Sequence, residues 1–332
     1  MKRRYAFLPA VIGWSAAAAA LAGAAPPAQR SAISEYDRHV AVAKAASTGV
    51  AARLIGLCAL PTGGERRPPA FGRERQLIAP QRVFDQLYYV GLANLSAWVI
   101  DTGDGLVLID ALNNAGEANE VIVTGMQRLG LDPAKLRYII VSHGHGDHYG
   151  GAATLATRFG ARVIASDVDW KLMASPARMN NPAWNPPPAR DMTVTDGQTL
   201  RVGRTAITFY VTPGHTPGTL SLIFGVNQGA KRHVAAFWGG TAFNFAPTAA
   251  NFATYAKSAK RFGRIAEQAG ADVILSNHPT YDNTVANLAM LRDGKPADAN
   301  PYVVGRQATG NFFTVASECA QARQTATQGN EP

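Results

Sequence analysis

Three imidazoles and one carboxylate stand within six consecutive residues, from His143 to His148, directly after an apolar run. In a hydrophobic core each of these groups would need its own hydrogen-bond partner, so the stretch is poorly suited to a core. Imidazole and carboxylate are ligands of divalent cations, and two adjacent cations can share one water molecule. The stretch therefore predicts a site for two metal ions, and a solvated surface loop is the disfavoured alternative.

The flanking residues place this stretch on a turn between a strand and a helix. Residues 136–141 are apolar with little alternation, which indicates a buried strand, and residues 149–156 are typical of a helix start. Gly144 and Gly146 alternate with the ligands and allow a sharp turn without Cβ clashes. The side chains around them can therefore converge on one point.

Two further histidines follow the same design. His215 lies in a turn after the apolar strand 209–212, and His278 follows the apolar strand 273–276. Strand ends at one edge of a sheet meet in space, and α/β enzymes place their sites there. We expect both histidines to join the first cluster. The other two histidines, His39 and His233, lack such a context, and we expect them to be ordinary surface or helix residues.

Composition and the N-terminus indicate an exported globular protein. The chain has 332 residues, 47% hydrophobic and 17% charged, which suits one large domain or two small ones. Basic residues 2–4 precede an apolar run at 5–21 and the small residues 22–24, a pattern typical of a secretory signal peptide over 1–24. The alternative, a membrane-spanning helix, is disfavoured because the run is short and interrupted. We expect a periplasmic or secreted protein without stable membrane association after cleavage, by either the general or the twin-arginine route.

Charge and cysteine content narrow the range of partners. The formal charge of +9 includes the three basic residues of the leader, and the remaining Lys and Arg are scattered, which excludes a nucleic-acid surface. A small-molecule substrate is expected, and the oligomeric state is left open. Cys58 and Cys319 are the two cysteines, and in an exported chain we favour a disulfide between them over two free thiols.

Short strands are predicted at 96–100 and 106–110, with a hairpin turn at 102–105 between them, and a helix at about 115–129 follows. The order of predicted elements is β-rich, α/β, β-rich and α/β again. This order favours two sheets face to face with helices outside. The expected segments are a signal peptide at 1–24, an N-terminal helical segment and linker at 25–80, the catalytic domain at 81–320 and a disordered tail at 321–332.

These motifs resemble the metallo-β-lactamase superfamily over roughly residues 81–318. The pattern His-x-His-x-Asp-His is present at 143–148, and the later Pro-Gly-His and Asn-His-Pro segments match the remaining ligands of that family. The resemblance implies an α/β fold, the αββα sandwich of two mixed sheets with helices on the outer faces. It also implies two Zn²⁺ ions. One would be held by His143, His145 and His215, and the other by Asp147, His148 and His278.

One departure points to a subclass. Many members place a bridging Asp between the third and last histidine ligands, and other lactamase subclasses use a Cys, but residues 216–271 contain neither. This resembles subclass three of the metallo-β-lactamases and implies a zinc-dependent hydrolase that opens a β-lactam, with a role in antibiotic resistance. Two zinc ions would lower the pKa of a bridging water, and the resulting hydroxide would attack the amide carbonyl. Asp147 is the expected catalytic residue because it would bind one zinc and orient that water.

The sequence predicts the substrate less well than the metal. The segment 239–244 departs from the serines that the lactamase subclass offers to a substrate carboxylate; Thr241 and Asn244 are candidate replacements, and Trp184, in a long proline-rich loop, is a candidate lid residue. Hydrogen bonding within the loop, or anchoring of the loop by Trp184, is the alternative for each. Two other functions are kept: an exported dizinc hydrolase of a lactone, ester or other amide, and a catalytically silent binding module, which is disfavoured.

Overall fold

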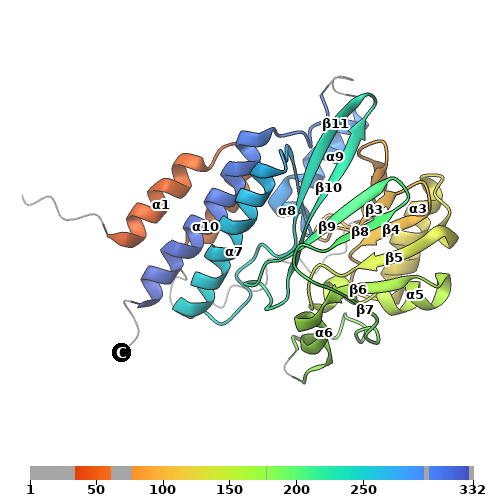
Figure 1. The fold of residues 1–332 in the computed structure, drawn as a ribbon, viewed down its shortest axis with the longest axis horizontal. Coiled ribbons are helices and arrows are strands. Elements are labelled where there is room, and N and C mark those ends of the chain that lie inside the picture. The colour runs from red at the N-terminus through yellow and green to blue at the C-terminus, as the bar shows by residue number, and fades with distance from the viewer. Residues whose placement is uncertain (1–33, 61–76, 177, 295–298, 329–332) are drawn as a thin grey trace, which may run out of the picture. The chain divides into compact units, whose positions relative to one another are not determined.

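Two β-sheets lie face to face in the computed structural model, and helices cover both outer faces (Figure 1). The structure describes residues 34–60, 77–176, 178–294 and 299–328. The expected αββα sandwich of two mixed sheets is confirmed.

The first sheet has seven strands that run in sequence order across it. The pairs from β1 to β4 are antiparallel, and the pairs from β4 to β7 are parallel. The predicted turn at 102–105 joins β3 to β4. The strands are β1 (Gln81–Arg82), β2 (Leu87–Tyr89), β3 (Trp98–Asp101), β4 (Leu106–Ile109), β5 (Leu136–Ile140), β6 (Arg162–Ser166) and β7 (Met192–Val194).

The second sheet has five strands in the order β12, β11, β10, β9, β8. Its pairs are antiparallel except for β11 with β12, which are parallel. This parallel pair brings the end of β12 to the edge where β11 ends, so the segments that follow both strands lie at one edge. The strands are β8 (Thr199–Val202), β9 (Thr205–Val211), β10 (Leu220–Gln228), β11 (Lys231–Trp238) and β12 (Val273–Ser276).

Strand periodicity explains how one sheet contributes to two cores. Successive side chains of a strand point to opposite faces. Val99 therefore packs in the core beneath the helices, while Ile100 packs between the sheets. In β4, Leu108 packs beneath the helices and Val107 packs between the sheets. Strands that are apolar on both faces must be covered on both, which is why the chain needs helices outside each sheet.

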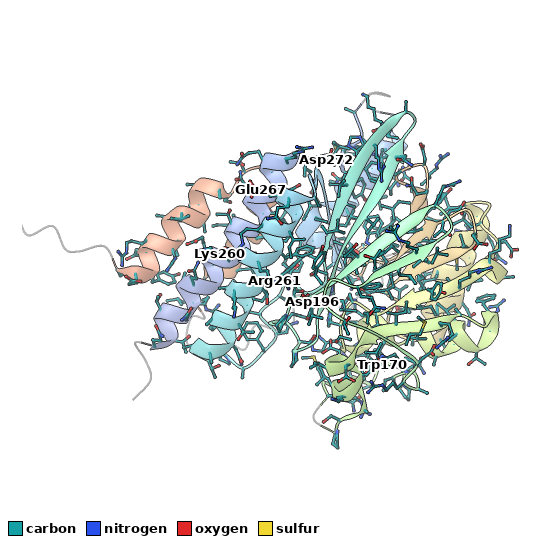
Figure 2. The ribbon with its side chains drawn as sticks, in the orientation of Figure 1. Trp170, Asp196, Lys260, Arg261, Glu267 and Asp272 are labelled. Atoms are coloured by element: carbon teal, nitrogen blue, oxygen red, sulfur yellow. A yellow bond between two sulfur atoms is a disulfide. The ribbon has the colours of Figure 1, made fainter. Side chains whose placement is uncertain are left out.

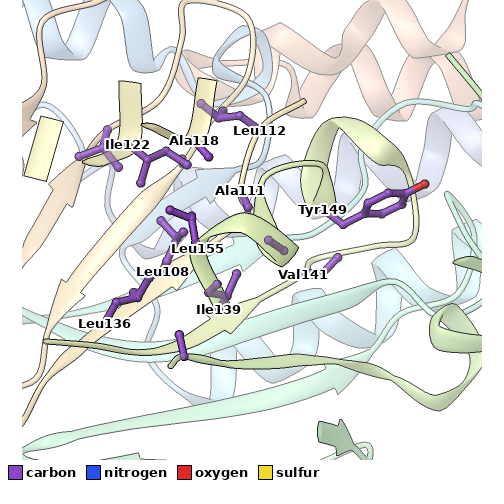
Figure 3. Close-up of a cluster of buried hydrophobic side chains, with 14 of the residues drawn as sticks. Leu108, Ala111, Leu112, Ala118, Ile122, Leu136, Ile139, Val141, Tyr149 and Leu155 are labelled. Atoms are coloured by element: carbon purple, nitrogen blue, oxygen red, sulfur yellow. The ribbon is translucent and has the colours of Figure 1, made fainter. Parts of the chain in front are cut away.

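The helices of the first outer layer bury the apolar face of β4 and β5. Figure 3 shows Leu108 and Ile139 of the sheet beside Ala118, Ile122 and Leu155 of these helices. The predicted helix at 115–129 forms, with one π-helical turn inside it. The elements of this layer are α2 (Ala115–Glu117), the π-helical segment Ala118–Val123, α3 (Thr124–Arg128), α5 (Ala152–Phe159) and α6 (Asp167–Ala174).

The second outer layer joins the N-terminal segment to the C-terminal helix. The residues that share this core come from α1 (Glu35–Ala46), the 3-10 helix Gly49–Cys58, α7 (Ala249–Gln268) and α10 (Arg306–Gln328). The predicted disulfide is confirmed: Cys58 and Cys319 are bonded, with an S–S distance of 2.04 Å. An ion pair between His39 and Glu318 (2.7 Å) lies in the same interface. The N-terminal helices thus belong to the sandwich.

The disordered tail predicted at 321–332 is wrong for the residues that the structure describes. Helix α10 continues to Gln328 and buries Ala322, while Arg323 donates a hydrogen bond to the Ala59 carbonyl (2.8 Å). Packing against the N-terminal helices stabilises this segment, which its polar composition did not predict. The predicted signal peptide and most of the linker lie outside the described residues. Among the described helices, none has the length and apolar character needed to cross a membrane.

Candidate metal centre

Three histidine nitrogens converge on one point at the edge of the sandwich. His143 and His145 follow β5, in the metal turn at residues 142–148, and His215 lies in the turn between β9 and β10. The Nε2 atom of His143 lies 3.0 Å from both Nδ1 of His145 and Nε2 of His215, and the latter two atoms are 3.2 Å apart. Sequence reasoning predicted this convergence.

The hydrogen bonds on the opposite side of two rings identify the converging atoms as lone pairs. Nδ1 of His143 bonds the Gly239 carbonyl (2.8 Å), and Nδ1 of His215 bonds the Ala242 carbonyl (2.6 Å). A carbonyl only accepts, so each Nδ1 carries the proton and each Nε2 of the neutral ring is an acceptor. Acceptors that face one another need a cation between them. Zn–N bonds of about 2.0–2.1 Å at tetrahedral angles place ligand nitrogens about 3.3–3.4 Å apart, close to the observed spacing.

A second group lies beside the first. Oδ2 of Asp147 is 3.5 Å from Nε2 of His148 and 3.8 Å from Nε2 of His278. Nδ1 of His148 bonds Asp110 (2.8 Å), and Nδ1 of His278 bonds the Asn94 carbonyl (2.9 Å), so both Nε2 atoms face Asp147. Within the described residues, the buried Oδ1 of Asp147 and Nε2 of His148 have no hydrogen-bond partner. Buried polar atoms of this kind fit a metal ion.

Burial keeps most of these rings neutral. Desolvation, followed by the neighbouring histidines, lowers the pKa of His145 to about 3, and desolvation is also the largest cause that lowers the pKa values of His215 and His278 to about 4. His148 differs because two neighbouring carboxylates outweigh its desolvation and raise its pKa. A metal ion bound to Nε2 of His148, in place of a second ring proton, would supply the positive charge that both carboxylates favour. The electrostatics of both groups therefore suit cations.

Asp110 is a functional residue that sequence reasoning missed. It directly follows β4, is fully buried and has a left-handed backbone with φ 61°. Its Oδ1 accepts from the backbone N–H of Ser142 (2.7 Å), and its Oδ2 accepts from the Ser142 hydroxyl (2.8 Å) and from His148. The signal was present in the sequence, since an acid directly after an apolar strand repeats the design of the histidine segments.

The substitution Asp110→Asn is expected to weaken Zn²⁺ binding by about 10–100-fold, the usual effect of losing the partner of a metal-binding histidine. The amide would no longer accept on both atoms, so the orientation of the His148 ring would be lost. Competition with a chromophoric chelator measures this affinity. The control is Asp104→Asn, which changes an exposed carboxylate paired with Arg137. Unchanged affinity of the Asp110 variant would contradict the assigned role.

The three candidate substrate residues occupy different positions. Thr241 is fully buried, with its hydroxyl 3.4 Å from that of Ser276 at the end of β12, so the structure favours a structural role for this side chain over substrate contact. Asn244 is exposed. Trp184 is half-buried with its ring against Gly146, where a Cβ would come within 2.5 Å of the ring. Trp184 therefore covers the metal turn.

The remaining histidines, His39 and His233, have partners outside the metal centre. His39 bonds Glu318, and His233 bonds Asp272 (2.7 Å). Among the described residues, two groups have ligand atoms close enough to hold a metal ion. They are His143 with His145 and His215, and His143 with Asp147 and His148. The latter overlaps the group of Asp147, His148 and His278 described above but contains His143 in place of His278.

Comparison with known proteins agrees with this geometry. Residues 90–229 match the family model described as the metallo-beta-lactamase superfamily. A metallo-beta-lactamase from Cronobacter sakazakii with a HARLDQ motif is similar in structure, with 27% identity over 78% of this chain and 92% of that chain and a TM-score of 0.64. A subclass B3 metallo-beta-lactamase of Bradyrhizobium japonicum has 26% identity over 76% of this chain and 97% of that chain, with a TM-score of 0.61.

Curated sequences add a second activity among the relatives. A hydroxyacylglutathione hydrolase of Acidiphilium cryptum is 31% identical over 134 residues, which are 40% of this chain and 46% of that relative. The chain thus spans less than half the length of the first curated relatives that it matches.

Proposed function

Because this chain belongs to the metallo-β-lactamase superfamily and is most like its subclass B3, we propose that it is an exported dizinc hydrolase whose substrate is a β-lactam. The observation that carries the proposal is the convergence of three histidine nitrogens, 3.0–3.2 Å apart and two of them unprotonated, beside a second group that contains a buried carboxylate oxygen without a hydrogen-bond partner. Without cations, these buried acceptor atoms would face one another with no partner.

Each metal position has three protein ligands in this proposal. His143, His145 and His215 would hold one zinc, and the second group would hold the other through the ligands Asp147, His148 and His278. Two zinc ions would supply a water that ionises near neutral pH and a Lewis acid for the carbonyl oxygen. The chain itself fixes the ligand rings through backbone carbonyls. Asp147 contributes a second buried oxygen, which can accept a hydrogen bond from the attacking water.

The segment after β11 supports a lactamase of subclass three over the members of the superfamily that use a bridging Asp or a Cys. Residues 216–271 supply no Asp or Cys. The structure adds a steric reason at the strand end: a Cβ on Gly239 would overlap the Leu220 carbonyl, and a Cβ on Gly240 would overlap His215. Neither position has room for a bridging carboxylate. This segment therefore supplies no bridging carboxylate to the metal site.

A different native substrate remains the second candidate, and the loop at 239–244 supports it. Thr241 turns its hydroxyl to Ser276, and the loop contains no serine that could bind a substrate carboxylate. Two phenylalanines flank Asn244 and pack with Tyr255, the ring of Phe243 at 4.8 Å and that of Phe245 at 6.1 Å. A lactone, an ester or another amide without a carboxylate fits such a loop.

Hydrolysis assays decide between the two. We expect the purified zinc-loaded chain to hydrolyse a penicillin, a cephalosporin and a carbapenem, and a chelated sample to be inactive until zinc is restored. Turnover of a lactone or an ester, without turnover of any β-lactam, would refute the first candidate and establish the second. Chelator-resistant turnover would refute the metal mechanism in both.

Export is part of the proposal and rests on two features. The leader at 1–24 has the basic, apolar and small-residue regions of a signal peptide. The Cys58–Cys319 disulfide supports the same location, because such bonds persist in oxidising compartments such as the periplasm. Fractionation of cells that express the full chain, with immunodetection of the processed form, tests it. Unprocessed protein in the cytosol would contradict it.

A further inference from the structure

Asp169 links three segments of the chain through one buried carboxylate. It lies in the first turn of α6 and is 1% exposed. Its Oδ2 accepts from the backbone N–H of Gly144 (2.8 Å) and the hydroxyl of Thr216 (2.6 Å), while its Oδ1 accepts from the backbone N–H of Gly218 (2.8 Å). All three donors belong to turns outside α6. A buried carboxylate with three donors of this kind is a fixed anchor.

The two turns that it joins are those of the three-histidine position. Gly144 stands between His143 and His145, and Thr216 directly follows His215. These turns are about 70 residues apart, as the separations of 70 and 72 between the contacting histidines show. The backbone between two ligands and the side-chain hydroxyl beside the third therefore bond to the same oxygen atom.

Helix α6 is itself held rigidly at this place. Ser166 caps the helix by accepting from the backbone N–H of Asp169 (3.1 Å). Trp170, labelled in Figure 2, donates from its indole to the Met192 carbonyl of β7 (2.8 Å). The approach of the His215 turn to this helix is close, since a Cβ on Gly218 would overlap the Ser166 hydroxyl. The anchor is therefore fixed on the first sheet and reaches a turn of the second.

We propose that Asp169 is a positioning residue that preorganises the three-histidine position for its metal ion. The inference rests on the metal site of the proposed function and is independent of the substrate. Different carboxylates support the second metal position. Asp110 accepts from His148, and Asp282 accepts from the backbone N–H of Ser276, two residues before His278. Loss of Asp169 should therefore affect one metal position and spare the other.

The substitution Asp169→Asn keeps the size of the side chain and changes its hydrogen bonding. Its amide nitrogen is a donor and must face at least one of the three donors, so at least one of the three hydrogen bonds is lost. Thr216→Val removes only the hydroxyl that reaches Asp169 and keeps a similar shape. It provides a second test if the first variant does not fold.

The experiment isolates each position before it measures Zn²⁺ affinity by chelator competition. A His278→Ala background leaves the three-histidine position, and a His215→Ala background leaves the other. In the first background, Asp169→Asn and Thr216→Val are each expected to weaken Zn²⁺ binding by about 10–100-fold. In the second background, each of these two variants should change the Zn²⁺ affinity by less than about twofold. Equal losses in both backgrounds would overturn the proposal.

Two control variants separate positioning from general destabilisation. Asp167→Asn changes an exposed carboxylate of the same helix turn, paired with Lys171 and Arg190, and should leave both affinities unchanged. Asp282→Asn removes an equally buried carboxylate, which accepts from Ser276 (2.7 Å) and Thr284 (3.1 Å). If Asp282→Asn weakened the three-histidine position as much as Asp169→Asn does, the role of Asp169 would be structural only.

The outcome is distinguishable from failure of the proposed function. A chain that binds Zn²⁺ with this pattern but hydrolyses no β-lactam would refute the substrate and leave the role of Asp169 established. A wild-type chain that binds no Zn²⁺ would overturn both.

Discussion

Replacement of His143 by alanine is expected to lower kcat/KM by about 10³-fold or more, because loss of a direct ligand should exceed the 10–100-fold effect of losing a ligand's hydrogen-bond partner. His143 has the largest expected effect because it belongs to both candidate metal groups. Its Nε2 faces His145 and His215, and its ring centroid lies 4.2 Å from that of His148. Without His143, the three-histidine position keeps only two ligand nitrogens, and the second position loses a neighbouring ring.

The measurement combines turnover with metal content. We expect His278→Ala to lose most activity as well, with about one zinc per chain retained, since its ring belongs to the second group only. The matched control is His39→Ala, a histidine paired with Glu318 on the outer helices, which should keep both turnover and metal. Circular dichroism would verify that each variant is folded. Full turnover by either site variant would refute the dizinc assignment.

Loss of the Cys58–Cys319 disulfide is expected to lower the unfolding midpoint by about 4–10 °C, which corresponds to about 2–5 kcal/mol. The bond joins residues 261 apart in sequence, so it restricts nearly the whole unfolded chain. It also fixes the end of the 3-10 helix on α10, where both cysteines are buried. Without the bond, the N-terminal helices would be held by packing and by single contacts such as Arg323 with Ala59.

Thermal unfolding of the Cys58→Ser/Cys319→Ser variant, with and without a reductant, measures this effect. The reductant should lower the midpoint of the wild type and leave that of the variant unchanged. The zinc content should be the same in both, because neither cysteine contacts the metal turn. Two titratable thiols in the native protein would refute the bond itself.

The local pattern of residues was enough to predict most of the fold and all the candidate ligands. Strand periodicity is a property of neighbouring residues, and so the strands around 98–109, the strand before the metal turn and the turn at 102–105 were predicted correctly. The tail was predicted wrongly because the polar residues after Ala322 carry no local signal for the surface against which α10 packs.

Residue chemistry and strand period are local, so the order of amino acids is enough to show which side chains can bind metal and that they follow strand ends. Which atoms of those side chains face the metal site depends on how the two sheets pack. The proton on Nδ1 of His143 is set by a carbonyl 96 residues away, and that of His215 by one 27 residues away. Asp110 and Asp169 likewise act through partners from other turns. Such hydrogen bonds form only when the two sheets pack, so no local pattern specifies them.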